Sequence, residues 1–129
     1  MNLPITTIFA AIFVLALIPL TIQVGLKRLA IRMFFGDGGD LALAQRRAAQ
    51  SNYLEHVPIF LVALAICEIT GAPALLLWSA GGCMLVARTV HAYCMLFTNG
   101  IGDSRAVGMM LTFAAHLALG GFLVARALG

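Results

Sequence analysis

Residues 50–60 read QSNYLEHVPIF and place an amide, a carboxylate and an imidazole directly before an apolar run. The uninterrupted run that follows, from Val57 to Cys67, is 11 residues long. A helix of that length covers roughly 16 Å, about half of the hydrocarbon core of a bilayer. If this segment crosses a membrane, Asn52, Glu55 and His56 must lie inside the span.

The composition indicates that lipid is the solvent. The chain has 129 residues, of which 62% are hydrophobic and 10% charged, and its mean hydropathy is +1.02. A soluble domain carries about 25% charged residues, so this chain lacks the polar surface to cover a globule. The formal net charge of +3 then reports orientation in the membrane rather than an anionic partner such as a nucleic acid.

Four segments are long enough to cross a bilayer, which takes about 20 apolar residues. We place them at about 3–26, 48–70, 74–97 and 106–127. No Lys or Arg precedes the first, so we expect a retained membrane helix rather than a cleaved signal peptide. The sequence thus predicts an all-α integral membrane four-helix bundle, with residues 1–129 forming one domain.

The basic residues predict the orientation of the bundle. Five of the eight Lys and Arg residues lie in the loop 27–47, Arg105 follows the loop 98–104, and Arg126 lies at the C-terminal end. The GAP turn at 71–73 carries no charge. Since basic loops stay in the cytoplasm, we expect loops 27–47 and 98–104 to be cytoplasmic and both termini to lie on the other side.

Several polar residues suggest local structure rather than a site. Cys67, Cys83 and Cys94 lie in apolar stretches without metal-ligand spacing, so we expect free, buried thiols and no metal. Asp37 and Asp40 flank glycines and are expected to form a turn rather than a cation site.

Further residues carry expectations about helix packing and helix ends. Glu68 is expected to reach headgroups or water beside the GAP turn, and His116 to make an interhelical hydrogen bond. Small residues are expected to let helices approach closely, namely Gly108, Ala115, Gly120 and Gly121.

Depth can be counted outward from Ala72 in the GAP turn. Glu55 lies 17 residues before it and Arg88 16 after it, while Asn52 lies 20 before and His91 19 after. An antiparallel hairpin brings each pair to one level, and residues at i and i+3 share a helix face. The count predicts an ion pair between Glu55 and Arg88, with Asn52 beside His91 one turn nearer the cytoplasm.

A charged residue at the centre of a membrane helix raises the free energy of insertion by about 2.5–3.5 kcal/mol, unless it pairs with an opposite charge or faces a water-filled cavity. One interpretation is a structural clasp in which Glu55 and Arg88 neutralise each other. The other is a polar pocket for an anionic ligand. The second is favoured because further polar side chains crowd the same level, namely Gln50, Asn52, His56, His91 and Arg105.

Three motifs together resemble the MAPEG family, the membrane-associated proteins in eicosanoid and glutathione metabolism. They are RRAAQSNYLEHVP at 46–58, RTVH at 88–91 and SRAVGMMLT at 104–112, and the matching residues are Arg47, Gln50, Asn52, Glu55, Pro58, Arg88, His91, Arg105 and Gly108. The GDGGD loop at 36–40 is similar to that of bacterial members, which implies a bacterial inner membrane. The resemblance runs from about residue 24 to 113.

The resemblance implies a homotrimer of four-helix protomers that binds glutathione between neighbours on the cytoplasmic side. Family members include glutathione transferases, glutathione peroxidases, and the leukotriene and prostaglandin synthases. By position, Arg105 would be catalytic and stabilise the glutathione thiolate, while Arg88 would hold Glu55. The residues that would bind glutathione are Arg28, Arg32, Arg47, Gln50, Asn52, Glu55, His56, Arg88 and His91.

The resemblance implies a simple reaction without a metal. A guanidinium beside the glutathione thiol lowers the thiol pKa by favouring the thiolate. The thiolate then attacks an apolar electrophile or a lipid peroxide that arrives through the bilayer. The expected partners are therefore other copies of the chain, membrane lipids and an apolar small molecule.

Three positions depart from the family pattern. Ala48 stands where many relatives have Arg, and His56 and Met95 stand where synthases often carry Tyr. Two alternatives remain open: a non-catalytic protein of this fold that binds a thiol or lipid, and a small proton-coupled transporter with Glu55 as carrier. The expected pairing with Arg88 argues against the transporter, because it would hold Glu55 ionised, whereas a proton carrier must gain and lose its proton.

Overall fold

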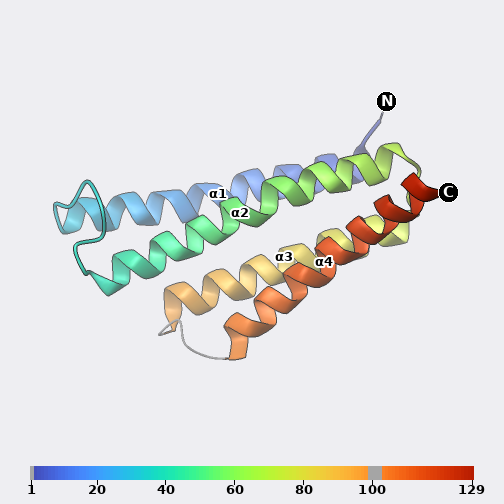
Figure 1. Cartoon of the computed structure of the whole chain (residues 1–129). Helices are drawn as coiled ribbons and strands as arrows, with labels where there is room; N and C mark the ends of the chain where they lie inside the picture. Colours follow the sequence, from blue (N-terminus) through green and yellow to red (C-terminus); the bar gives the residue numbers. More distant parts are fainter. Residues whose placement is uncertain (1, 99–102) are drawn as a thin grey trace.

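The computed structural model describes residues 2–98 and 103–129, which form four long helices. They are α1 (Pro4–Ala30), α2 (Leu41–Ile69), α3 (Ala74–Phe97) and α4 (Asp103–Leu128). In Figure 1, α1 runs alongside α2 and α3 alongside α4. Both termini and the α2–α3 turn lie at one end of the bundle, and the α1–α2 loop lies at the other.

All four helices are long and apolar enough to cross a membrane, so the prediction of an all-α protein with four candidate spans is confirmed. The predicted spans fall on these helices, although α2 begins at Leu41, well before the span predicted from 48. The extension is stabilised at its N-cap, because Asp40 Oδ1 accepts a hydrogen bond from the Leu43 N–H at 2.8 Å.

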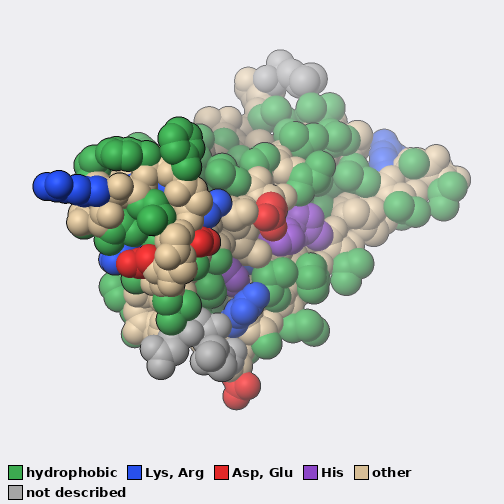
Figure 2. All heavy atoms as spheres, turned by 60° about the vertical axis from the view of Figure 1, so that its left-hand side comes forward, with side chains coloured by type: hydrophobic (Ala, Val, Ile, Leu, Met, Phe, Trp, Pro, Cys, Tyr) green, Lys and Arg blue, Asp and Glu red, His purple; other side chains and the backbone are tan. Residues whose placement is uncertain are grey.

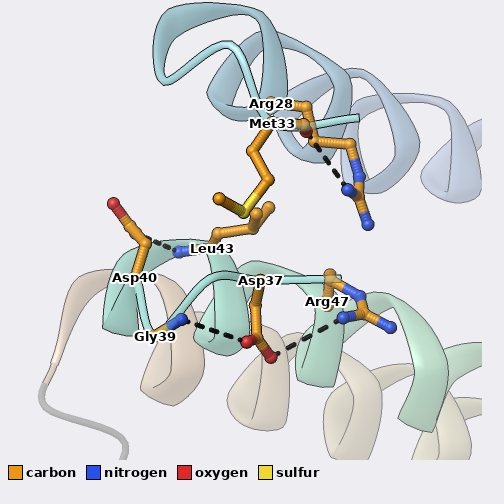
Figure 3. A network of polar contacts seen from close by, with 7 residues as sticks. All are labelled: Arg28, Met33, Asp37, Gly39, Asp40, Leu43 and Arg47. Atoms are coloured by element: carbon orange, nitrogen blue, oxygen red, sulfur yellow. Dashed lines mark hydrogen bonds and ion pairs between the residues drawn. The ribbon is translucent and has the colours of Figure 1, made fainter. Parts of the chain in front are cut away.

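The α1–α2 loop is held by charged contacts, which Figure 3 shows in part. Lys27 Nζ lies 2.9 Å from Asp40 Oδ2, and Arg47 Nη1 lies 3.7 Å from Asp37 Oδ2. Asp37 also accepts a hydrogen bond from the Gly39 N–H. The Lys27 ammonium, followed by the Leu43 N–H, holds the pKa of Asp40 below its ordinary value. The two aspartates therefore form a turn, as predicted, and Asp40 in addition caps α2.

Glu68, which the sequence places beside the GAP turn, also caps the first helix. Its Oε1 and Oε2 accept hydrogen bonds from the backbone N–H groups of Ile5 and Thr6 at 2.9 and 2.8 Å. Helix α1 has no side-chain cap of its own, so its first N–H groups need an acceptor from elsewhere. A carboxylate there also complements the positive end of the helix dipole.

Helices α3 and α4 approach closely at Gly108, as predicted, whereas nothing among the described residues lies within 4 Å of an added Cβ at Gly120 or Gly121, where a close approach was also predicted. A Cβ at this position would lie 3.1 Å from Ala87 O and 3.2 Å from the Cβ of His91. The rest of the core is apolar, apart from buried groups such as the Tyr53 hydroxyl, which donates to Phe13 O at 2.6 Å and links α2 to α1. Close packing at Gly108 fixes the position of His91 relative to α4.

Candidate functional site

The buried guanidinium of Arg88 links three helices. Its Nη1 donates to the side-chain Oδ1 of Asn52 on α2 and, at 3.3 Å, to the backbone oxygen of Asn52. Its Nη2 donates to the hydroxyl of Thr112 on α4, and that hydroxyl donates in turn to Gly108 O at 2.8 Å. Arg88 therefore fixes the relative positions of α2, α3 and α4 near the polar residues.

The predicted ion pair between Glu55 and Arg88 is wrong. Glu55 is exposed and accepts a hydrogen bond from the Ser51 hydroxyl at 2.8 Å, and within residues 2–98 and 103–129 no carboxylate pairs with Arg88. Glu55 lies two positions from the buried Tyr53, a rotation of about 200° around the helix. It therefore faces outward, while Asn52, nearer the buried face, meets Arg88. The objection to a proton carrier, which depended on this pair, fails with it.

A hollow of about 220 Å³ lies where α2, α3 and α4 meet, and we call it the polar hollow. It is lined by Ala48, Ser51, Asn52, Glu55, His91, Met95 and Arg105. Four predicted site residues thus share one cavity although they are far apart in the sequence. Asn52 and His91 line the same hollow, which agrees with the depth count that placed them side by side.

A second hollow, of about 380 Å³, lies beside the first and shares Ala48 and Ser51 with it. It is lined by Asp37, Ala44, Arg47, Ala48, Gln50, Ser51 and Leu54. Within it, Arg47 pairs with Asp37, and Gln50 Nε2 donates to Thr21 Oγ1 at 3.0 Å. Two more candidate residues therefore lie next to the polar hollow rather than in it.

Besides Arg88, three candidates lie outside both hollows of the single chain. Arg28 donates to Met33 O at 3.3 Å, as Figure 3 shows, and Arg32 is exposed with a φ of 52°. The ring of His56 packs against the rings of Phe113 and His116, with centroid distances of 6.5 and 5.6 Å. None of the three contacts the residues that line the polar hollow through a hydrogen bond among the described residues.

His116 differs from its predicted role. Its Nδ1 lies 2.8 Å from Thr112 O, one turn earlier on the same helix, so the bond is intrahelical. A carbonyl oxygen can accept but not donate, so Nδ1 carries the hydrogen. The ring still packs across the helix interface against Phe60.

Two hydroxyl residues that support the site, Ser51 and Thr112, were not predicted from the sequence. Ser51 donates to Glu55, and Thr112 accepts from Arg88. Each hydroxyl bonds to a residue four positions away on its own helix. Ser51 lies four residues before Glu55, and Thr112 lies four residues after Gly108. Residues four apart share a helix face. Hydroxyl residues at this spacing within apolar spans could therefore have indicated these contacts.

The polar side chains of the site lie on a surface that is otherwise largely hydrophobic. Figure 2 shows acidic, basic and histidine side chains close together on a face that also carries broad hydrophobic areas. Glu55 and Arg105 are both exposed in the single chain. Ionisable groups on membrane-spanning helices normally face a partner, a bundle interior or a wet cavity.

The model of the MAPEG family matches residues 6–125. The chain is similar to "Inner membrane protein YecN" of Escherichia coli K12, with 27% identity over 113 residues that cover 88% of this chain and 85% of the relative. The protein of the same name from Escherichia coli O6:H1 gives the same values. No solved structure matches the chain significantly.

Proposed function

The chain belongs to the MAPEG family, and from this premise we propose that it is a membrane-bound glutathione-dependent transferase or peroxidase. The observation that carries the proposal is the polar hollow. It gathers an amide, a carboxylate, an imidazole and a guanidinium from α2, α3 and α4, namely Asn52, Glu55, His91 and Arg105. Such a set complements a small ligand that carries carboxylates, amides and an amino group.

The proposed roles follow from charge. Glu55 carries the negative charge that an ammonium group requires, and Asn52 and His91 supply neutral hydrogen-bonding groups. Arg105 carries the positive charge that stabilises a thiolate. Arg88 acts as a positioning residue, because its hydrogen bonds hold Asn52. Gln50 and Arg47 lie next to the polar hollow and would contact the ends of a ligand that is longer than the hollow.

The proposed reaction begins when the glutathione thiol loses its proton to water and the thiolate pairs with Arg105. In a transfer, the sulfur attacks an electrophilic carbon and the leaving group departs with its bonding electrons. In a peroxidase reaction, the sulfur attacks a peroxide oxygen, an alcohol leaves, and a second glutathione converts the sulfenic acid to the disulfide with loss of water. Proximity and charge stabilisation supply the rate enhancement.

We further propose that the protein is a homotrimer in a bacterial inner membrane, with the polar hollow on the cytoplasmic side. Glu55 and Arg105 are exposed in the single chain, and contact with another copy would cover them. Arg28 in the last turn of α1 and Arg32 in the α1–α2 loop are then available to a neighbour's site. The basic α1–α2 loop supports a cytoplasmic position, and the relative is an inner membrane protein by name.

Two alternatives each have one supporting observation. Ala48 lines both hollows and offers no donor, which favours a protein that binds a thiol or lipid without catalysis. Glu55 has no basic partner among the described residues, which is compatible with a proton carrier. Binding of glutathione without turnover would indicate the first. A proton flux into liposomes that is lost in Glu55→Gln would indicate the second.

The proposed function is tested by turnover of glutathione with 1-chloro-2,4-dinitrobenzene and with cumene hydroperoxide. Arg105→Ala is expected to lower turnover by about a hundredfold, the effect of removing one charge-stabilising donor. Arg126→Ala is the matched control, since Arg126 is exposed in the last turn of the same helix. Equal turnover in wild type and Arg105→Ala would remove Arg105 from the mechanism.

A further inference from the structure

A third cavity lies away from the polar hollow, between α1 and α3. This apolar groove has a volume of about 280 Å³, and its walls include Phe13 and Leu20 of α1 and Leu85 and Ala92 of α3. Its lining also contains Arg88, which does not line the polar hollow. The stretch of α3 that lines it, residues 85–97, is roughly 18 Å long. The groove therefore has the elongated, apolar shape that suits a hydrocarbon chain.

The charge of Arg88 is left uncompensated by the part of the chain that the structure describes. Its side chain is 4% exposed, and its hydrogen-bond acceptors are the neutral Asn52 and Thr112. Its buried Nε–H has no hydrogen-bond partner among those residues. A buried charge without a counter-charge is costly, and more so inside a membrane. The site is thus short of one negative, hydrogen-bond-accepting group.

We propose that the apolar groove binds a long-chain carboxylate, such as a fatty-acid anion. The hydrocarbon chain packs along the groove, and the carboxylate lies against Arg88, where it accepts from the free Nε–H and neutralises the guanidinium. Charge complementarity selects this ligand over a neutral lipid, because apolar walls alone do not distinguish the two. The inference does not depend on the proposed glutathione chemistry.

This site would be linked to the polar hollow through one side chain. Arg88 contacts the groove, and its Nη1 holds Asn52, which lines the hollow. A ligand that shifts Arg88 therefore changes the position of Asn52, and such coupling is reciprocal between the two sites.

The test is native mass spectrometry of the full chain released from detergent micelles, titrated separately with oleate, methyl oleate and oleyl alcohol. Oleate is expected to bind about tenfold or more tightly than the two neutral analogues, which cannot pair with a charge. Ala92→Phe, which fills the groove, is expected to abolish oleate binding. Ala11→Phe is the matched control, because Ala11 is an exposed alanine of α1 outside the groove.

Equal binding of the three lipids to the wild-type protein would overturn the proposal without any variant. Oleate binding that survives in a folded Ala92→Phe protein would also overturn it. Loss of glutathione turnover with oleate binding intact would contradict the proposed function and leave this inference standing.

Discussion

Arg88 donates to both the side-chain and the backbone oxygen of Asn52, so a buried guanidinium on α3 fixes an amide of α2 that lines the polar hollow. The partner of this intramembrane arginine within the chain is therefore neutral. A change in Arg88 or Asn52 is therefore expected to affect both the stability of the fold and the shape of the polar hollow.

Asn52→Ala is expected to lower the free energy of unfolding by about 1.5–3 kcal/mol, the range for hydrogen bonds to a charged group. The loss arises because the Arg88 Nη1 loses its side-chain acceptor and keeps only the 3.3 Å hydrogen bond to the backbone oxygen at position 52. The measurement is SDS-induced unfolding in mixed micelles, followed by far-UV circular dichroism. Asn52→Asp, which keeps an acceptor and adds a counter-charge, is the control and should retain stability. Equal stability of wild type and Asn52→Ala would show that the contact contributes little.

Glu68→Gln should loosen the start of α1. The carboxylate accepts from two backbone N–H groups, whereas a glutamine amide offers one oxygen and places its NH₂ against the other donor. Hydrogen exchange at Ile5 and Thr6 is therefore expected to become faster. Glu55→Gln serves as the control, because Glu55 bonds to the Ser51 hydroxyl and not to α1. Unchanged exchange at both amides would contradict the capping role of Glu68.

Gly108→Ala and Gly120→Ala are expected to have opposite effects. At Gly108 a methyl group meets Ala87 O and the Cβ of His91, so α3 and α4 must separate. Stability and glutathione affinity should both fall, by about 1–3 kcal/mol in stability. At Gly120 nothing lies within 4 Å of the added methyl, so the helix propensity of Ala should stabilise the protein slightly. Equal effects in the unfolding assay would contradict the close approach at Gly108.

Asp40 predicts an acid-sensitive loop. Its pKa is lowered in the folded protein by Lys27 and the Leu43 N–H. The stabilisation is thus complete above the unfolded pKa of about 4 and is lost as pH falls through the folded pKa. Between pH of about 5 and about 3, the apparent Tm of Asp40→Asn should fall less than that of the wild type.

Asn caps a helix about as well as Asp, so Asp40→Asn isolates the ion pair, while Asp40→Ala removes the cap as well. Asp40→Ala should therefore have the lower apparent Tm of the two at neutral pH. Parallel pH profiles for wild type and Asp40→Asn would show that the charge of Asp40 contributes nothing.

The sequence was sufficient to predict the four helices and the proximity of Asn52 to His91, which line one hollow. Span length placed Asn52, Glu55 and His56 inside α2, and counting from Ala72 placed Asn52 level with His91. Both deductions use helix rise alone, which is nearly constant. The motif resemblance then led to the MAPEG family, to which the chain belongs.

The prediction of a Glu55–Arg88 ion pair was wrong because the depth of a residue along a helix does not determine which way its side chain points around the helix axis. Residues at i and i+3 differ by about 60° around a helix, which separates Asn52, facing Arg88, from the outward Glu55. Side chains that cap or bond across the bundle were also missed, since Glu68 reaches α1 through a contact 63 residues away in the sequence. Such contacts depend on how whole helices pack, which periodicity within one helix does not reveal.

The proposed role of Arg105 is tested most directly by the ultraviolet difference absorbance of the glutathione thiolate on the purified protein at neutral pH. We expect a thiolate band for the wild type and for Arg126→Ala. In Arg105→Ala glutathione should still bind, by equilibrium dialysis, but the band should be absent. A thiolate band of full size in Arg105→Ala would show that Arg105 does not stabilise the thiolate, and no binding of glutathione to the wild type would overturn the proposed function.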